Sequence, residues 1–120
     1  MALTPTPRQG DVWWAQLDPI RGSEIAKTRP VLILSVDQIN HSPAGLSICV
    51  PLTTTPHTTR VRIELPTGDR GQTRVSHADA LQVRSLSHDR LTERIARAPD
   101  DACSEVARRL ALFTRHDAGG

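Results

Sequence analysis

One segment near the N-terminus combines a side chain suited to binding anions with two strand-like flanks. It runs from Gly10-Asp11-Val12-Trp13-Trp14 through a charged loop to Arg29-Pro30 and an apolar run. A loop between two buried strands can present the Arg29 guanidinium to a ligand, and that group matches the oxygens of phosphates and carboxylates. An arginine at a strand start can equally form a salt bridge, here to Glu24 or Asp18, so the residue alone leaves both interpretations open.

Further polar side chains follow two later apolar stretches. Thr53 and Thr54 come directly after Pro51-Leu52, where their hydroxyls could hold a phosphate oxygen beside Arg29 or could simply end a strand. His77 and Asp79 are two residues apart on an expected strand, so they share one face. Imidazole exchanges protons near neutral pH, which suits a general base, although a lone histidine on a strand is more often structural.

Composition restricts the function classes. The net charge of +2 does not by itself indicate a nucleic-acid binder. Lys27 is the sole lysine beside fourteen arginines, and arginine forks suit phosphates and bases, although a codon bias would explain the same count. Tyrosine is absent and Phe113 is the only phenylalanine, which argues against a domain that stacks RNA bases on sheet aromatics. Cys49 and Cys103 form neither a zinc pattern nor a disulfide framework, so no metal or other cofactor is expected.

The chain of 120 residues fits one domain, which can bury enough surface to fold without disulfides or metal. We expect this domain at 8–116, between a loose lead-in at 1–7 and a short tail at 117–120. No stretch approaches the ~20 apolar residues of a membrane span, and the N-terminus lacks an apolar signal core. These features predict a soluble, cytoplasmic protein without a membrane partner.

Hydrophobic periodicity predicts many short strands and one long helix. The helix is expected at 100–115, where Cys103, Val106, Leu110 and Phe113 form one apolar stripe. Two stretches are expected to be irregular: a loop at 37–45 and a turn at 66–71. Ser87 is placed to cap a single helical turn. The expected strands are 12–17, 30–36, 46–52, 60–65, 74–80 and 81–84, whereas the pattern of 92–98 is compatible with either a strand or a helix. This order predicts a mainly β small barrel closed by a C-terminal helix.

The order of several short motifs resembles the MazF/PemK (Kid-like) toxin family. The motifs are Gly10 to Trp14, Asp18-Pro19, Gly22-Ser23-Glu24, Arg29-Pro30, Pro51 to Thr54 and Gln82 to Leu86, and the likeness continues into the final helix. The resemblance implies an SH3-like barrel of the CcdB/MazF/PemK type and a metal-independent endoribonuclease. It also implies a short last strand at 92–98, single-stranded RNA, expected to be messenger RNA, as the substrate, a cognate MazE-like antitoxin and a homodimer.

The resemblance also implies roles for individual residues. In such enzymes the RNA 2′-hydroxyl attacks the neighbouring phosphorus, and the protein must move protons and stabilise the developing charge. Arg29 and Thr53 fall on catalytic positions of the family, with Thr54 beside them. The family usually carries an acid immediately before Gln82, but Leu81 stands there. Asp79, displaced by ~6.7 Å along the strand, or His77 is therefore a candidate base, unless Arg29 and Thr53 suffice.

RNA binding is expected from five further residues. Arg21, Glu24 and Lys27 lie in the first long loop, which the family uses to contact RNA and antitoxin. Trp14 and Gln82 complete the set, although a tryptophan such as Trp14 is more often part of the core or of a dimer interface than a platform for bases. Two other functions keep the barrel without this chemistry: a CcdB-like gyrase-binding toxin, and a non-catalytic barrel that binds nucleic acid.

Overall fold

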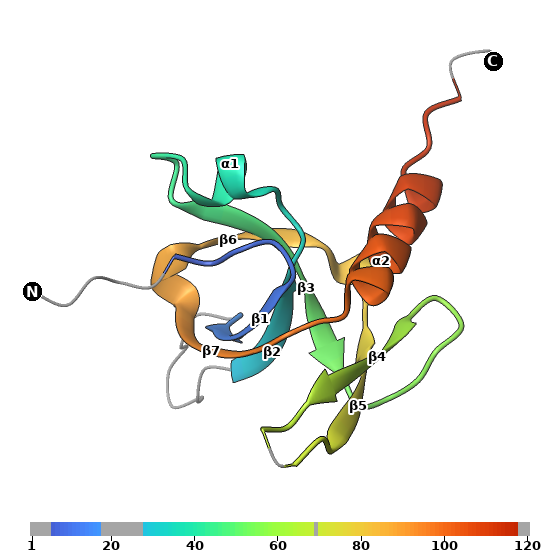
Figure 1. The fold of residues 1–120 in the computed structure, drawn as a ribbon. Helices are drawn as coiled ribbons and strands as arrows, with labels where there is room; N and C mark the ends of the chain where they lie inside the picture. The colour runs from blue at the N-terminus through green and yellow to red at the C-terminus, as the bar shows by residue number, and fades with distance from the viewer. Residues whose placement is uncertain (1–5, 18–27, 69, 118–120) are drawn as a thin grey trace, which may run out of the picture.

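The computed structural model describes residues 6–17, 28–68 and 70–117, and it is mainly β with one long helix near the C-terminal end (Figure 1). Seven strands, two helices and two single 3-10 turns make up the described chain. In order they are β1 (Asp11–Gln16), β2 (Thr28–Ile33), α1 (Asp37–Asn40), β3 (Leu46–Thr53), β4 (Val61–Pro66), β5 (Thr73–Ala78), η1 (Ala80–Gln82), β6 (Arg84–Ser87), η2 (His88–Arg90), β7 (Leu91–Arg97) and α2 (Asp100–Phe113).

The strands form a curled antiparallel sheet in the order β4-β5-β3-β2-β1-β7, and β6 pairs with β3 off this path. Strand β3 has two sets of partners. Its first half, including Ile48 and Cys49, pairs with β6, whereas Leu52 and Thr53 at its end pair with β5. The β4–β5 hairpin continues the sheet beyond the end of β3, below α2 in Figure 1, and the sheet curls so that β4 contacts β7. The predicted mainly β barrel with a C-terminal helix is confirmed.

The central strands bury side chains on both faces. In β1, Val12 belongs to one hydrophobic cluster and Trp13 to the other, because successive side chains of a strand point to opposite faces. The same division separates Leu32 from Val31 and Ile33 in β2, as its continuous apolar run predicts. Strand β4 instead alternates buried and exposed residues, which fits its one covered face.

Helix α2 covers one of these clusters. Val106 is fully buried there, and Cys103 and Leu110 pack partly against it. Asp100 and Asp101 occupy the first turn, where carboxylates favour the positive end of the helix dipole. The helix ends at Phe113, two residues before the expected end, and Phe113 is 42% exposed. The predicted apolar stripe therefore stops one turn earlier than its sequence pattern suggests.

Two local predictions are wrong. The expected strand at 81–84 is interrupted by the turn η1, because the Gln82 N–H donates to the Asp79 carbonyl and the Val83 N–H to that of Ala80. The expected loop at 37–45 begins with the helix α1, which ends on the buried residue Asn40. The cap at Ser87 is confirmed, since its hydroxyl accepts the Asp89 N–H, and the last strand, β7, is confirmed at 91–97.

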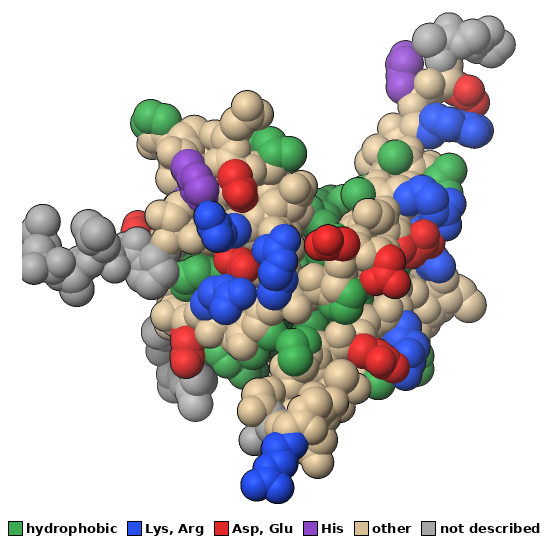
Figure 2. All heavy atoms as spheres, viewed as in Figure 1, with side chains coloured by type: hydrophobic (Ala, Val, Ile, Leu, Met, Phe, Trp, Pro, Cys, Tyr) green, Lys and Arg blue, Asp and Glu red, His purple; other side chains and the backbone are tan. Residues whose placement is uncertain are grey.

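Surface charge is mixed on the face that Figure 2 displays, where basic and acidic side chains are interspersed over the strands and along the helix. No helix within the described ranges is long and apolar enough to cross a membrane. The expected lead-in at 1–7 and tail at 117–120 fall largely outside the described residues, which begin at 6 and end at 117.

Candidate active site

Arg29 and Thr53 lie at the same end of two paired strands. Strand β2 pairs with β3 so that Val31 is opposite Pro51. Arg29 comes two residues before Val31, and Thr53 comes two residues after Pro51. Because the strands are antiparallel, both steps lead toward the same end of the pair. Residues 24 positions apart in the chain are thereby brought to one edge of the sheet.

Two neighbouring pockets open at this edge and share Arg29, Leu52 and Thr53. One, which we call the polar pocket, has a volume of about 260 Å³. It is lined by Leu17, Arg29, Pro51, Leu52, Thr53, Arg60, Asp79, Gln82 and Arg84. The other, the apolar pocket, has a volume of about 250 Å³. It is lined by Val12, Trp14, Arg29, Pro30, Leu52, Thr53, Thr54, Leu65, Arg74, Ser76 and Ile95.

The carboxylate of Asp79 faces an arginine in the polar pocket. Its Oδ2 atom lies 3.4 Å from Nε of Arg60, and the two side chains are only 15% and 24% exposed. The Asp79 backbone N–H donates to the Pro51 carbonyl at 3.0 Å, which fixes the start of the turn η1 against β3. Asp79 is therefore in the candidate site, but its carboxylate already has a cationic partner.

Positive charge dominates the polar pocket. Arg29, Arg60 and Arg84 are accompanied by a single described carboxylate, that of Asp79. The Arg84 guanidinium donates from Nη2 to the Leu17 carbonyl at 3.1 Å, which holds it against the end of the first strand. An anionic ligand that displaces water from this pocket would meet fixed guanidinium donors.

Hydroxyl groups extend the same edge. The Oγ1 atom of Thr53 accepts the Thr55 N–H at 3.3 Å, which leaves its own proton available for donation. Thr54 is exposed and lines the apolar pocket with Trp14, a residue that is 38% exposed. The apolar pocket is thus a place where a flat, partly polar group can lie against an aromatic ring beside Arg29.

His77 is near this edge but lines neither pocket. Its backbone pairs with Thr53 across β3 and β5, and its side chain is half-buried. Of the remaining predicted site residues, Gln82 lies in the polar pocket. Arg21, Glu24 and Lys27 lie outside the described residues.

Sequence reasoning missed Arg60 and Arg84 as members of the polar pocket. Arg84 stands in the motif Gln82-Val83-Arg84, yet only its position after η1 brings it toward Leu17. Arg60 precedes β4 and is 31 residues from Arg29, so nothing local connects the two. The alternation of Arg60, Arg62 and Glu64 predicts an exposed position for Arg60, whereas its side chain is only 24% exposed, so this pattern gave no signal for the pocket.

Other potentially reactive groups of the described residues, such as the thiol of Cys49, line neither of these two pockets. Cys49 is buried, and burial raises the pKa of its thiol to about 12, which makes it a poor nucleophile. Nowhere in the described ranges do three or more His, Cys, Asp or Glu side chains gather closely enough to hold a metal ion.

Comparison with known proteins identifies the family. Residues 8–114 match the family model described as "PemK-like, MazF-like toxin of type II toxin-antitoxin system". The chain belongs to this family. The endoribonuclease MazF9 of Mycobacterium tuberculosis (strain ATCC 25618 / H37Rv) is 30% identical in an alignment of 111 residues that covers 88% of this chain and 93% of that protein. The endoribonuclease toxin MazF of Escherichia coli (strain K12) is 37% identical over 81 residues, 68% of each protein.

Solved structures agree with this assignment to the MazF-like toxins. A crystal structure of MazE-MazF from Deinococcus radiodurans aligns with a TM-score of 0.75 and 29% identity, covering 94% of this chain and 99% of that one. MazF from the same organism aligns with a TM-score of 0.69 and 30% identity, covering 91% and 96%. The family predicted from the ordered motifs is confirmed.

Proposed function

We propose that this MazF-like chain is the toxin of a type II toxin–antitoxin system and cleaves single-stranded RNA without a metal ion. The observation that carries the proposal is the meeting of Arg29 and Thr53, from different strands, at the mouth of a pocket lined by arginines. The same activity is supported by relatives that are named endoribonucleases and that align with this chain over most of their length. RNA is the substrate because the reaction uses its 2′-hydroxyl, which DNA lacks.

The proposed reaction is an in-line transesterification. The 2′-oxygen forms a bond to phosphorus as the bond from phosphorus to the 5′-oxygen breaks, giving 2′,3′-cyclic phosphate and 5′-hydroxyl ends. The 2′-hydroxyl loses a proton and the departing 5′-oxygen gains one. In this scheme the Arg29 guanidinium donates to the phosphoryl oxygens as negative charge accumulates, and the Thr53 hydroxyl donates beside it.

Proton transfer has two candidate acceptors in the chain. The Asp79 carboxylate lies in the polar pocket, and His77 lies opposite Thr53 outside it. The pH–rate profiles of Asp79→Asn and His77→Gln test these roles, because removal of the general base abolishes the acid limb of the profile. A profile unchanged in both variants would assign proton transfer to solvent.

The activity is tested by incubating the purified protein with a long single-stranded RNA in EDTA and mapping the ends. We expect discrete cuts with cyclic phosphate ends. Arg29→Ala should reduce the rate about 10²–10³-fold, since a preorganised donor to developing charge is lost. Arg29→Lys should recover little, because an ammonium does not reproduce the guanidinium fork.

Arg62→Ala is the matched control, since Arg62 is an exposed strand arginine, 61% accessible, that lines neither pocket. It should cleave like the wild type. Intact RNA with the wild-type protein would overturn the proposal in favour of a gyrase-binding toxin or a passive nucleic-acid binder. Full cleavage by a folded Arg29→Ala variant would remove Arg29 from the mechanism.

A toxin of this kind requires an inhibitor, and we propose a MazE-like antitoxin and action in the cytoplasm. The arginine-lined edge favours an acidic segment that folds on binding and occupies the pockets around Arg29. Inhibition should then weaken as salt rises, because the charges across the interface are screened. The inhibitor and a non-cleavable RNA analogue should exclude each other, and simultaneous saturation by both would place the inhibitor elsewhere.

We also propose that the active form is a homodimer. A single barrel offers two shallow pockets, whereas two barrels side by side form a groove long enough for several nucleotides. Helix α2 is needed to cover the core around Val106, so the interface is expected on strands and loops. Sedimentation at micromolar concentration tests this, and a fully active monomer would contradict it.

A further inference from the structure

We propose that Arg60 is a second phosphate-binding residue for the RNA, and that Asp79 is a positioning residue that holds Arg60. This inference rests on the proposed function, because the phosphate belongs to the nucleotide next to the cleaved bond. Neither role follows from the motifs of the sequence, since Arg60 lies outside all of them.

The Arg60 guanidinium is tethered from two sides. Its Nε atom lies 3.4 Å from Oδ2 of Asp79, and its Nη1 atom donates to the Thr55 carbonyl at 2.7 Å. A guanidinium has five N–H donors, so these contacts leave both protons of Nη2 and one of Nη1. The Arg60 side chain lines the polar pocket. A side chain held in this way loses little rotamer entropy when it binds a ligand.

The ion pair between Arg60 and Asp79 is more deeply buried than the neighbouring ion pair between Arg62 and Glu64. Arg60 and Asp79 are 24% and 15% exposed, whereas Arg62 and Glu64 are 61% and 50% exposed. Largely buried ion pairs contribute little net stability, because desolvation offsets the attraction between the charges. An ion pair in such a place is therefore better explained by its position beside a ligand pocket than by stability of the fold.

The charge of the pocket favours an anion even after this pairing. Asp79 neutralises one guanidinium, which leaves the equivalent of two positive charges from the three arginines. A phosphodiester strand carries one negative charge per nucleotide, so an RNA with its reacting phosphate at Arg29 has another phosphate close by. Arg60 lines the same pocket as Arg29 and Thr53, on the side of β4 and Asp79, and can contact that neighbouring phosphate.

A positioning role for Asp79 reduces the number of candidate general bases. An amide in place of the Asp79 carboxylate would hold the Arg60 guanidinium less firmly. The carboxylate itself does not need to exchange a proton during cleavage to fill this role. Asp79→Asn should therefore weaken RNA binding while the shape of the pH–rate profile stays as in the wild type. His77 and solvent then remain as proton acceptors.

The test measures binding separately from cleavage. The probe is a fluorescent 2′-O-methyl RNA, which lacks the attacking hydroxyl, titrated by anisotropy at several salt concentrations. Arg60→Gln should bind roughly tenfold more weakly, as expected for one lost charged hydrogen-bonding contact. The slope of log affinity against log salt should fall by about 0.7, the value for one phosphate of a single strand. Arg62→Gln, which changes an exposed arginine of β4 two residues after Arg60, should change neither quantity.

A double-mutant cycle tests the positioning role of Asp79. Asp79→Asn should weaken binding, and the variant with both substitutions should bind like Arg60→Gln alone, because the two residues act as a unit. Arg60→Lys is a further check, since it should retain the salt slope while losing affinity. Denaturant unfolding of each variant shows that the fold is intact.

Two results would overturn the inference. One is an unchanged salt slope in folded Arg60→Gln, and the other is an Asp79→Asn variant that binds normally but loses the acid limb of its pH–rate profile. Failure of the proposed function looks different. In that case wild-type protein leaves cleavable RNA intact, while the effect of Arg60→Gln on the salt slope can still be measured.

Discussion

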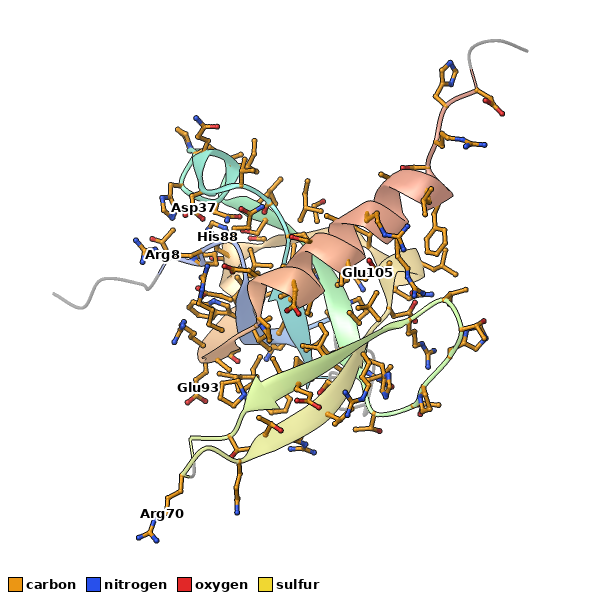
Figure 3. The ribbon with its side chains drawn as sticks, turned by 45° about the vertical axis from the view of Figure 1, so that its right-hand side comes forward. Arg8, Asp37, Arg70, His88, Glu93 and Glu105 are labelled. Atoms are coloured by element: carbon orange, nitrogen blue, oxygen red, sulfur yellow. The ribbon has the colours of Figure 1, made fainter. Side chains whose placement is uncertain are left out.

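Replacing Asn40 by alanine should destabilise the fold more than any other change on α1. Asn40 is 1% exposed, and its Oδ1 atom accepts the hydroxyls of Ser35 and Ser47. Its Nδ2 atom donates to the Ser35 carbonyl at 2.8 Å and to Oδ1 of Asp37 at 3.2 Å. Because the Ser47 proton is used on Asn40, the contact of 2.9 Å with His88 makes Nε2 of His88 the donor. Figure 3 labels Asp37, the first residue of α1, and His88, which follows β6.

The magnitude follows from the groups that lose their partner. Asn40→Ala removes the hydrogen-bond partner of the Ser35 carbonyl and of at least one buried hydroxyl. Each buried polar group left without a partner lowers the free energy of unfolding by about 1–3 kcal/mol. We expect a loss of about 3 kcal/mol in the free energy of unfolding. For a domain of this size that corresponds to a fall of roughly 12 °C in Tm.

Urea unfolding followed by tryptophan fluorescence measures this loss. Gln38→Ala, an exposed change on the same helix, is the control and should stay within about 0.5 kcal/mol of the wild type. Asn40→Asp should be no better than Asn40→Ala at neutral pH, since a carboxylate cannot donate to the Ser35 carbonyl and faces the Asp37 carboxylate. A loss below about 1 kcal/mol in Asn40→Ala would refute the reasoning, because the buried groups would then have found other partners.

Two further predictions follow from titratable groups. Burial raises the pKa of the thiols of both Cys49 and Cys103, and that of Cys49 rises to about 12. A thiol reagent at pH 8 should therefore label the native protein slowly and should reach Cys49 only on unfolding. Immediate labelling of both thiols would contradict this. Hydrogen bonds from Arg108 and Arg109 lower the pKa of Glu105 to about 2, so its contribution to stability is complete above about pH 4.5 and disappears as pH falls toward 2. Glu105→Gln should therefore be slightly less stable than the wild type at pH 7, equal to it near pH 2, and closer to it in high salt. An equal difference at both pH values would show that the ion pair is not responsible.

Much of the fold could be predicted from the sequence because its core strands carry unambiguous patterns. The apolar run after Pro30 predicted a strand buried on both faces, and the spacing of Cys103, Val106 and Leu110 predicted the helix. The turn at Leu81 could not be predicted, since alternating Leu81 and Val83 resemble a strand. That turn depends on the Asp79 backbone, whose N–H bonds to Pro51 on a distant strand.

The candidate site was predictable only where the residues lie in ordered motifs. Arg29 and Thr53 were found in this way, and the structure brings them to one edge. Arg60 was not found, because its approach depends on the β4–β5 pairing and on the ion pair with Asp79. The sequence placed His77 and Asp79 on one strand face, whereas only Asp79 lines the pocket.

The pairing of the first strand with the last has a consequence for the synthesis of the protein. Strand β1 pairs with β7, so Val12 meets Ala96 across more than 80 residues of chain. Ile95 of β7 also lines the apolar pocket beside Arg29, and the core needs Val106 from α2. Non-local strand pairings of this kind form late in folding, because the entropy of closing a long loop is lost before the contacts at its ends can stabilise the chain. On the ribosome the growing chain therefore lacks a finished pocket until β7 and α2 have emerged, so we expect a nascent chain of this toxin to be unable to cleave RNA at this site.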